Sequence, residues 1–148
     1  MSTALPLLAV FAFNSLLVLT AILLHYEVLY QLARRLPEVR IAPRYRVLLG
    51  VGVIFIAHVI EIWLFALGYL ISLRVEGIGG LVGEPSGHGA LMDYVYLSFI
   101  TFTTVGYGDL VVHGYLRYLT GVEALTGLIL ITWSASFLFL EMQKDWNR

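Results

Sequence analysis

Apolar residues in this chain gather in three runs that are long enough to cross a bilayer and a fourth that is too short. The long runs cover residues 5–30, 47–73 and 115–140. A helix needs about 20 residues, at about 1.5 Å each, to span the hydrocarbon core. The short run, residues 91–102, predicts a helix that enters the membrane only part-way. The pattern predicts an all-α membrane protein with three transmembrane helices and one re-entrant helix.

The short run leads directly into the sequence TTVGYGD, residues 103–109. Non-helical backbone at membrane depth is tolerated only where it is buried in protein or lines a cavity. Gly106 and Gly108 can adopt positive φ without a Cβ penalty, so an extended loop can aim successive carbonyls at one axis. Thr104 adds a hydroxyl oxygen at the inner end. The short helix and this loop together predict a pore loop rather than an ordinary Thr/Gly-rich turn.

Composition supports a membrane protein and excludes several kinds of chemistry. Of the 148 residues, 59% are hydrophobic and 13% are charged, which is typical of an integral membrane protein. The chain has no cysteine, which excludes disulfides, thiol nucleophiles and Cys-ligated metals. No apolar run carries arginine at every third position, so a voltage sensor of the usual kind is not expected.

Basic residues concentrate between the first two apolar runs. Five of the nine lie there: Arg34, Arg35, Arg40, Arg44 and Arg46. The positive-inside rule then predicts a cytoplasmic loop, an external N-terminus, an external glycine-rich segment at 74–90 and a cytoplasmic C-terminus. The same arginines could bind anionic lipids of the inner leaflet. A role in topology alone accounts for them equally well.

The order of these elements resembles the pore-loop potassium channels of the two-transmembrane-helix type, with one extra helix in front. The resemblance covers roughly residues 47–140 and depends mainly on TTVGYGD. It implies the following division of the chain: extra helix 1–33, basic loop 34–46, and pore domain 47–148 with outer helix 47–73, turret 74–90, pore helix 91–102, filter 103–109 and inner helix 115–140. The extra helix has few polar residues, so we expect it to pack outside the outer helix and face lipid on its other side.

The resemblance also implies function, assembly and location. It implies a homotetramer in the plasma membrane that conducts K⁺ passively, with no catalysis, no nucleic-acid partner and no cofactor besides the K⁺ ions in the filter. Backbone oxygens of the filter would replace the water shell of dehydrated K⁺. The implied filter residues are Thr104, Val105, Gly106, Tyr107 and Gly108, with Thr103 and Asp109 as its support and outer mouth. A non-selective cation pore is the alternative, which the intact Tyr107 and both glycines disfavour.

One position departs from the family pattern. Some family members carry a glutamate nine residues before the aspartate that follows the filter, and here that residue is Ile100. Asp109 therefore needs another partner or stays open to water. It is either a hydrogen-bonded strut or a charge that concentrates cations at the mouth.

Ionisable residues inside the predicted spans are candidates for function because a charge there is costly. Glu61 follows His58 by three residues, so the two share a helix face and can form a hydrogen bond. Two ligands without a third are weak evidence for a metal site. For Glu123 we expect a structural bond to a pore-helix hydroxyl such as Ser98 or Thr101, with protonation and a pH response as alternatives.

A membrane protein that holds haem between His25 and His58 is a more remote alternative. The predicted topology places His25 near the inner end of its span and His58 near the middle of the next. We therefore expect the two histidines to lie at different depths, which disfavours haem.

The last apolar run contains a stripe that could line a cavity. Its members recur at helical spacing and include two hydroxyls: Leu125, Ile129, Thr132, Ser136 and Leu140. Helix packing is the alternative. Gly127 stands near a position where family members have a hinge glycine, and close packing against a neighbouring helix explains it equally well.

Overall fold

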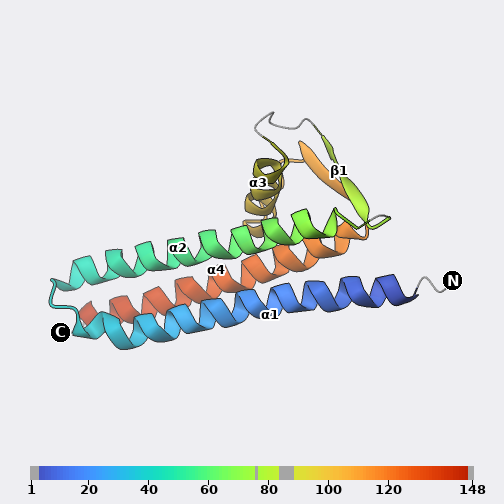
Figure 1. The fold of residues 1–148 in the computed structure, drawn as a ribbon. Coiled ribbons are helices and arrows are strands. Elements are labelled where there is room, and N and C mark those ends of the chain that lie inside the picture. The colour runs from blue at the N-terminus through green and yellow to red at the C-terminus, as the bar shows by residue number, and fades with distance from the viewer. Residues whose placement is uncertain (1–3, 76, 84–88, 147–148) are drawn as a thin grey trace.

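The computed structural model describes residues 4–75, 77–83 and 89–146. Three long helices dominate the fold (Figure 1): α1 (Ala4–Arg35), α2 (Pro43–Ser72) and α4 (Leu116–Trp146). A short helix, α3 (Ala90–Phe102), crosses the bundle between α2 and α4, and a turn of 3-10 helix, Leu36–Glu38, joins α1 to α2. The three long helices are apolar and long enough to span a membrane, and α3 is not. The predicted helical architecture is confirmed.

Local sequence explains where the helices begin and end. Pro43 opens α2 at its first position, where a missing N–H costs nothing and the fixed φ suits a helix. Helix α4 continues to Trp146, beyond the predicted end at residue 140. The added turns are polar, but Glu, Met, Gln and Lys are good helix formers, and Lys144 pairs with Glu141 one turn earlier.

The predicted glycine-rich turret contains a strand. β1 (Gly79–Gly83) pairs antiparallel with β2 (Leu110–Gly114), in the register Gly79↔Gly114. A Cβ on Gly79 would lie 2.0 Å from the carbonyl oxygen of His113 in β2, and one on Gly83 would lie 2.1 Å from that of Asp109, just before β2. These glycines therefore permit close approach of two backbones, so this part of the predicted turret is a paired strand. Residues 76 and 84–88 of the turret lie outside the described residues.

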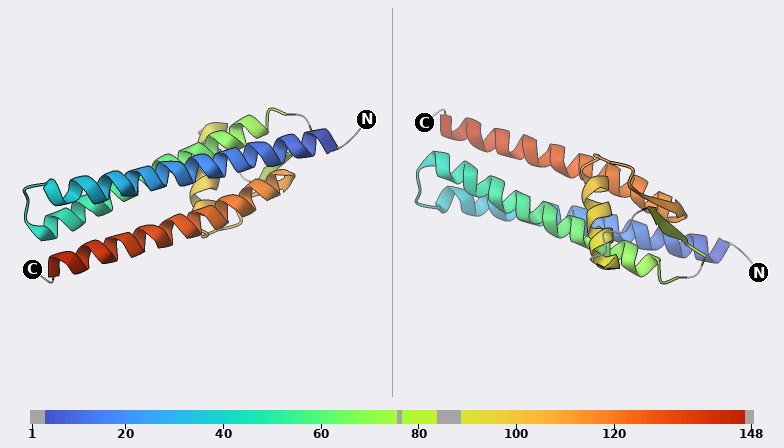
Figure 2. Two further views of the ribbon diagram at one scale, coloured as in Figure 1. Left: turned by 90° about the horizontal axis from the view of Figure 1, so that it is seen from below. Right: turned by 90° about the horizontal axis from the view of Figure 1, so that it is seen from above.

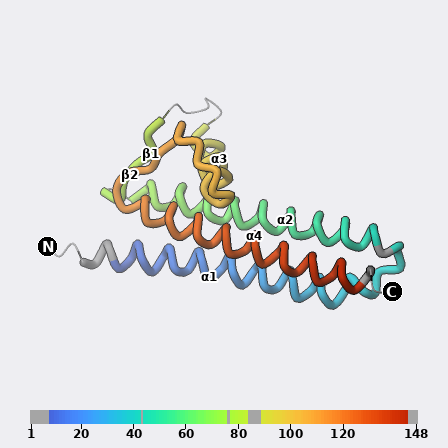
Figure 3. The backbone as a smooth tube through the Cα atoms, turned by 180° about the vertical axis from the view of Figure 1, so that it is seen from behind, coloured from blue at the N-terminus to red at the C-terminus, as the bar shows by residue number. Residues whose placement is uncertain are grey.

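The two ends of the bundle differ in character (Figures 1 and 2). The hairpin and the start of α1 lie at one end, and the 36–42 connection and the end of α4 lie at the other. The predicted arginine loop and the end of α4 thus share a side, as three successive spans require. Figure 3 shows the same arrangement from behind.

Helix α1 packs against α2, as expected, and also against α4, which the expectation did not include. Leu17 fills the space beside Gly68 of α2. The ring of Phe11 meets that of Tyr118 on α4 at a centroid distance of 4.6 Å. Asn14 is only 2% exposed. Asn14 and His25 are the buried polar residues of α1 in the described part of the chain, and Ser15, Thr20 and Glu27 are exposed.

Gly127 lies where α4 crosses the end of α3. A Cβ there would lie 2.0 Å from the carbonyl oxygen of Phe102, and α4 runs through this position without a break. Of the two explanations for Gly127, the structure supports close packing. This contact fixes the end of α3, from which the pore loop starts.

Candidate functional site

The pore loop, residues 103–109, begins as α3 ends. The Thr103 N–H donates to the Phe99 carbonyl at 3.2 Å, and the Thr103 hydroxyl donates to the same oxygen at 2.6 Å. The Gly106 N–H donates to the Ile100 carbonyl at 3.0 Å. The last turn of α3 thus anchors the loop through its free carbonyls.

Every second residue of the loop has a positive φ. The angles are 60° at Thr104, 51° at Gly106 and 84° at Gly108, while Val105 and Tyr107 keep negative values. Alternation of this kind gathers successive N–H groups on one face of the backbone and the carbonyls on the other. Thr104 is the only non-glycine residue with positive φ in the described part of the chain. A β-branched residue there is strained, and such strain clusters at functional sites.

The loop is uncovered in the single chain. Val105 is 52% exposed and Tyr107 is 74% exposed, and Thr103 to Gly108 are all exposed. A groove of about 500 Å³ separates the loop from the start of α4, where its lining includes Arg117, Thr120, Gly121 and Ala124. The loop is held at its base and open along its length.

The Asp109 carboxylate accepts a hydrogen bond from a side chain of α3. The Tyr96 hydroxyl donates to the Asp109 carboxylate at 2.6 Å, and this bond lowers the pKa of Asp109 from its ordinary 3.8. The carboxylate is nevertheless exposed, so it is a strut and an open charge at once. Tyr96 was not predicted as this partner. It lies one helical turn before Ile100, which occupies the position of the glutamate found in some family members.

Glu123 is fully buried at the junction of α2, α3 and α4. The Tyr69 hydroxyl donates to one carboxylate oxygen at 2.5 Å, and the Ser98 hydroxyl contacts the other. The predicted structural bond to Ser98 is confirmed, whereas the other suggested hydroxyl, Thr101, contacts Tyr69. Tyr69 itself was not predicted, because its sequence neighbours give no sign that it faces Glu123.

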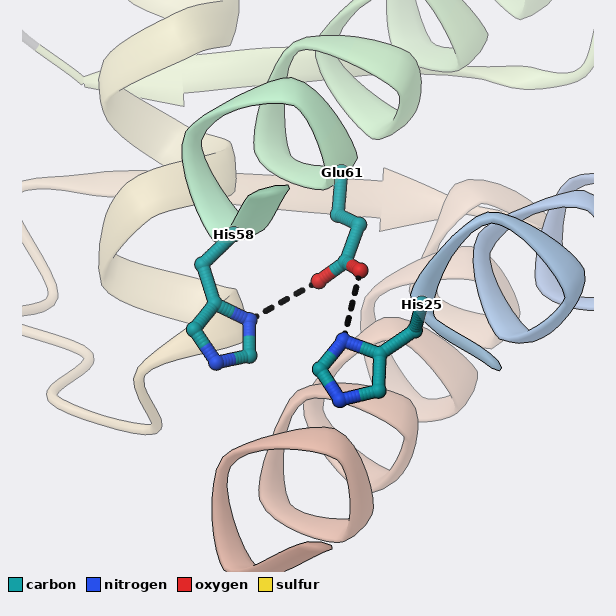
Figure 4. A group of neighbouring side chains, drawn as sticks. All are labelled: His25, His58 and Glu61. Atoms are coloured by element: carbon teal, nitrogen blue, oxygen red, sulfur yellow. Dashed lines mark hydrogen bonds and ion pairs between the residues drawn. The ribbon is translucent and has the colours of Figure 1, made fainter. Parts of the chain in front are cut away.

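A second polar cluster joins α1, α2 and α4 (Figure 4). Glu61 lies between two imidazoles, 2.9 Å from His25 Nδ1 and 2.8 Å from His58 Nδ1. The Ser134 hydroxyl lies 3.2 Å from Nε2 of each histidine. The predicted bond between His58 and Glu61 is confirmed. The sequence offered two ligand-type residues without a third, and His25 is the third, in a group whose ligand atoms are all within 4.8 Å of one another.

The predicted difference in depth between His25 and His58 is also wrong. Their rings stack at a centroid distance of 5.2 Å with an interplanar angle of 23°. A haem held by both would need its macrocycle between the two ligating nitrogens. The rings fill that space themselves, so this geometry does not fit a haem.

Residues of the predicted cavity stripe lie in a groove against α1 or on the exposed surface of α4. Leu125 and Ile129 line a groove of about 310 Å³ whose opposite wall includes Asn14 and Ser15 of α1. Thr132 and Ser136 are exposed, and their hydroxyls donate to carbonyls of their own helix at 2.8 and 3.0 Å. Leu140 is 56% exposed.

The basic loop is partly ordered by contacts with neighbouring aromatic rings and carbonyls. The Arg34 and Arg44 guanidinium groups lie 5.6 and 4.8 Å from the ring centroids of Tyr30 and Tyr45. Arg46 donates to the Val39 carbonyl at 3.2 Å. Arg34, Arg35, Arg40 and Arg44 are exposed at the same end of the bundle.

Comparison with known proteins gives one family match. A family model described as "Ion channel" matches residues 55–144. The matched segment takes in most of α2, the hairpin, the pore loop and nearly all of α4, and leaves out α1. No curated protein and no solved structure matches the chain.

Proposed function

The chain belongs to the ion channel family, and from this premise we propose that it is a potassium-selective channel assembled from four copies. The observation that carries the proposal is the alternation of positive φ at Thr104, Gly106 and Gly108. It gives one chain a row of carbonyls on one face of an extended loop. Rings of such carbonyls replace the hydration shell of K⁺.

The exposure of the loop supports assembly. Backbone polar groups at membrane depth must be covered by protein or line a water-filled path. Within the described part of the single chain, residues 103–108 are all exposed. Each chain supplies one loop, and a coordinating ring of carbonyls in this class of filter is formed by four loops. A homotetramer with the four loops around one axis meets both requirements.

The same geometry favours selectivity over a wide cation pore. The Tyr107 side chain and both loop glycines are present, and Thr104 accepts backbone strain in order to keep the alternation. A pore that passes any hydrated cation would need no such strain. Asp109, fixed by Tyr96 and open to water, would raise the local cation concentration at the mouth.

The α4 residues beside the pore loop indicate a different cavity-lining stripe from the one predicted from sequence. Gly121 and Ala124 are the α4 residues beside the loop, and helical spacing from them leads to Leu128, Ile131 and Ala135, all exposed. We infer that this stripe faces the water-filled cavity. Ile129 instead belongs to the groove against α1.

Reconstituted protein in planar bilayers tests the proposal. Under a K⁺ gradient against Na⁺, the wild-type reversal potential should lie close to the K⁺ equilibrium potential. Gly108→Ala should lose conduction or selectivity, because φ of 84° strains any residue with a Cβ. Gly52→Ala is the matched control, since a Cβ at Gly52 meets nothing within 4 Å. A wild-type reversal potential near zero, with K⁺ and Na⁺ carried equally, would contradict selectivity.

A further inference from the structure

The cluster of His25, His58, Glu61 and Ser134 plays no part in the proposed conduction path. His25 and Glu61 are completely buried, and the His58 side chain is 17% exposed. An ionised carboxylate at this depth is costly unless it is paired. The cluster also joins the segment matched by the family model to α1, because His25 belongs to α1, which the match leaves out.

The donor atoms form a recognisable metal-ligand set. Two imidazole nitrogens and one carboxylate are the three protein ligands of many zinc sites, in which a fourth position is held by water. Imidazole and carboxylate ligands suit first-row divalent cations. Here the three ligand-type side chains are brought together by two helices, and their ligand atoms all lie within 4.8 Å of one another. His58 is the least buried member, with 17% of its side chain exposed.

The orientation of the imidazole rings fits such an ion. Both Nδ1 atoms point toward Glu61 (Figure 4). Both Nε2 atoms lie 3.2 Å from the Ser134 hydroxyl. If both Nδ1 atoms bound a cation, each Nε2 would carry the ring hydrogen and donate it to the Ser134 oxygen. Metal-bound histidines usually donate their second ring nitrogen in this way, which fixes the ring.

Neutral rings without a cation satisfy the same contacts less well. If each Nδ1–H donates to Glu61, neither Nε2 carries a hydrogen. The single hydroxyl hydrogen of Ser134 can then serve only one of the two Nε2 atoms at 3.2 Å. One of the four contacts in the cluster is left without a hydrogen. An additional proton or a cation removes this shortage, and the convergence of three ligand atoms favours the cation.

We propose that His25, His58 and Glu61 bind one transition-type divalent cation per chain, for which Zn²⁺ is the suitable probe. Ser134 holds the two histidine rings from α4 without contacting the ion. The ion would tie α1 to α2 near the middle of the bundle, so the extra helix becomes a metal-dependent part of the pore domain. The proposal concerns binding alone and stands apart from ion selectivity.

Metal content of the full-length protein in detergent tests the site. After chelation and dialysis against Zn²⁺, elemental analysis should find one Zn²⁺ per wild-type chain. His25→Gln, His58→Gln and Glu61→Gln should each abolish stoichiometric binding, while His113→Gln, which alters an exposed histidine of β2, should bind as wild type does. Ser134→Ala should weaken binding by about 10 to 100-fold, as loss of an outer-shell partner does. A wild-type chain that binds no Zn²⁺, and so holds only a hydrogen-bonded cluster, would overturn the proposal.

A variant that gains an absorption band tests the site in a way that misfolding cannot imitate. Co²⁺ in place of Zn²⁺ should give the visible absorption of a four-coordinate nitrogen and oxygen site in the wild type. His58→Cys should add a thiolate-to-Co²⁺ charge-transfer band in protein that still elutes at the wild-type size, and the cysteine-free background excludes any other thiolate. Folded His58→Cys protein that binds Co²⁺ without this band would show that residue 58 is not a ligand, which contradicts the site.

Discussion

Tyr96 and Asp109 show how a single hydrogen bond fixes the outer end of the pore loop. The bond joins a side chain of α3 to the first residue after the glycine pair, at 2.6 Å. It favours the ionised carboxylate, since a donor to the charged form lowers an acid's pKa. The stability contributed by this bond is fully present above the ordinary pKa of 3.8 and is lost as the pH falls through the lower folded value.

Removal of the Tyr96 hydroxyl should therefore make the mouth more sensitive to acid. We expect Tyr96→Phe to raise the pKa of Asp109 toward 3.8, so that external acid reduces K⁺ current at a higher pH than in the wild type. Currents recorded over a series of external pH values measure this midpoint. Tyr115→Phe is the control, because Tyr115 is an exposed tyrosine outside α3. Equal midpoints in Tyr96→Phe and Tyr115→Phe would show that the bond does not govern the charge at the mouth.

Residues of the loop could be predicted individually from sequence, whereas their partners could not. The positive φ values at Gly106 and Gly108 follow from residue type. Tyr96, Tyr69 and His25 were missed as partners because each meets a carboxylate that is distant in sequence or on another element. A local sequence pattern does not reveal contacts between residues on different elements.

At the scale of elements, hydropathy located the helices well and their polar ends poorly. The prediction of 91–102 for the pore helix differs from α3 by one residue, because an apolar run and a glycine-containing loop mark both its ends. The last turns of α4 are polar and were missed. Strand β1 was missed because its glycines usually indicate a loop, and only the backbone of β2 explains them.

The contact between α3 and α4 leads to a prediction about Gly127. We expect Gly127→Ala to destabilise the protein by about 1 to 3 kcal/mol, as overpacking does, because its Cβ would lie 2.0 Å from the Phe102 oxygen. Gly52→Ala, also inside a long helix but without neighbours there, should instead gain up to about 1 kcal/mol from helix propensity. Thermal unfolding of both variants measures the difference. If Gly127→Ala is as stable as Gly52→Ala, close packing does not explain this glycine.

At the scale of the whole molecule, polar side chains connect the helices where lipid gives no hydrophobic driving force between them. Hydrogen bonds and close packing hold membrane helices together. Glu123 links α2, α3 and α4, and Glu61 links α1 and α2 with support from Ser134 of α4. The pore loop is local enough to predict from sequence. The place of α1 is not, because it depends on which polar residues of other helices its own residues meet.

The basic loop lies at the end of the bundle away from the hairpin. Arg34, Arg35 and Arg40 are exposed at one end of the bundle. Nearby lies a groove of about 350 Å³, lined partly by Arg35 and by apolar residues that include Leu36 and Val53. The lining also includes Glu27, so Arg35 is the one residue of this lining whose charge attracts an anionic headgroup. The expectation that the loop binds anionic lipid therefore rests on its exposed arginines.

We expect replacement of Arg34, Arg35 and Arg40 with Gln to weaken the response of the channel to anionic lipid. Each basic residue near an anionic surface contributes about 1 kcal/mol, so three should contribute about 3 kcal/mol at low salt. Arg44 and Arg46 remain to keep the loop on the cytoplasmic side, and Arg46 keeps its bond to the Val39 carbonyl. Open probability is measured in bilayers with and without phosphatidylglycerol, at two salt concentrations. If anionic lipid changes open probability equally in wild type and triple variant, the three arginines act as topology signals alone.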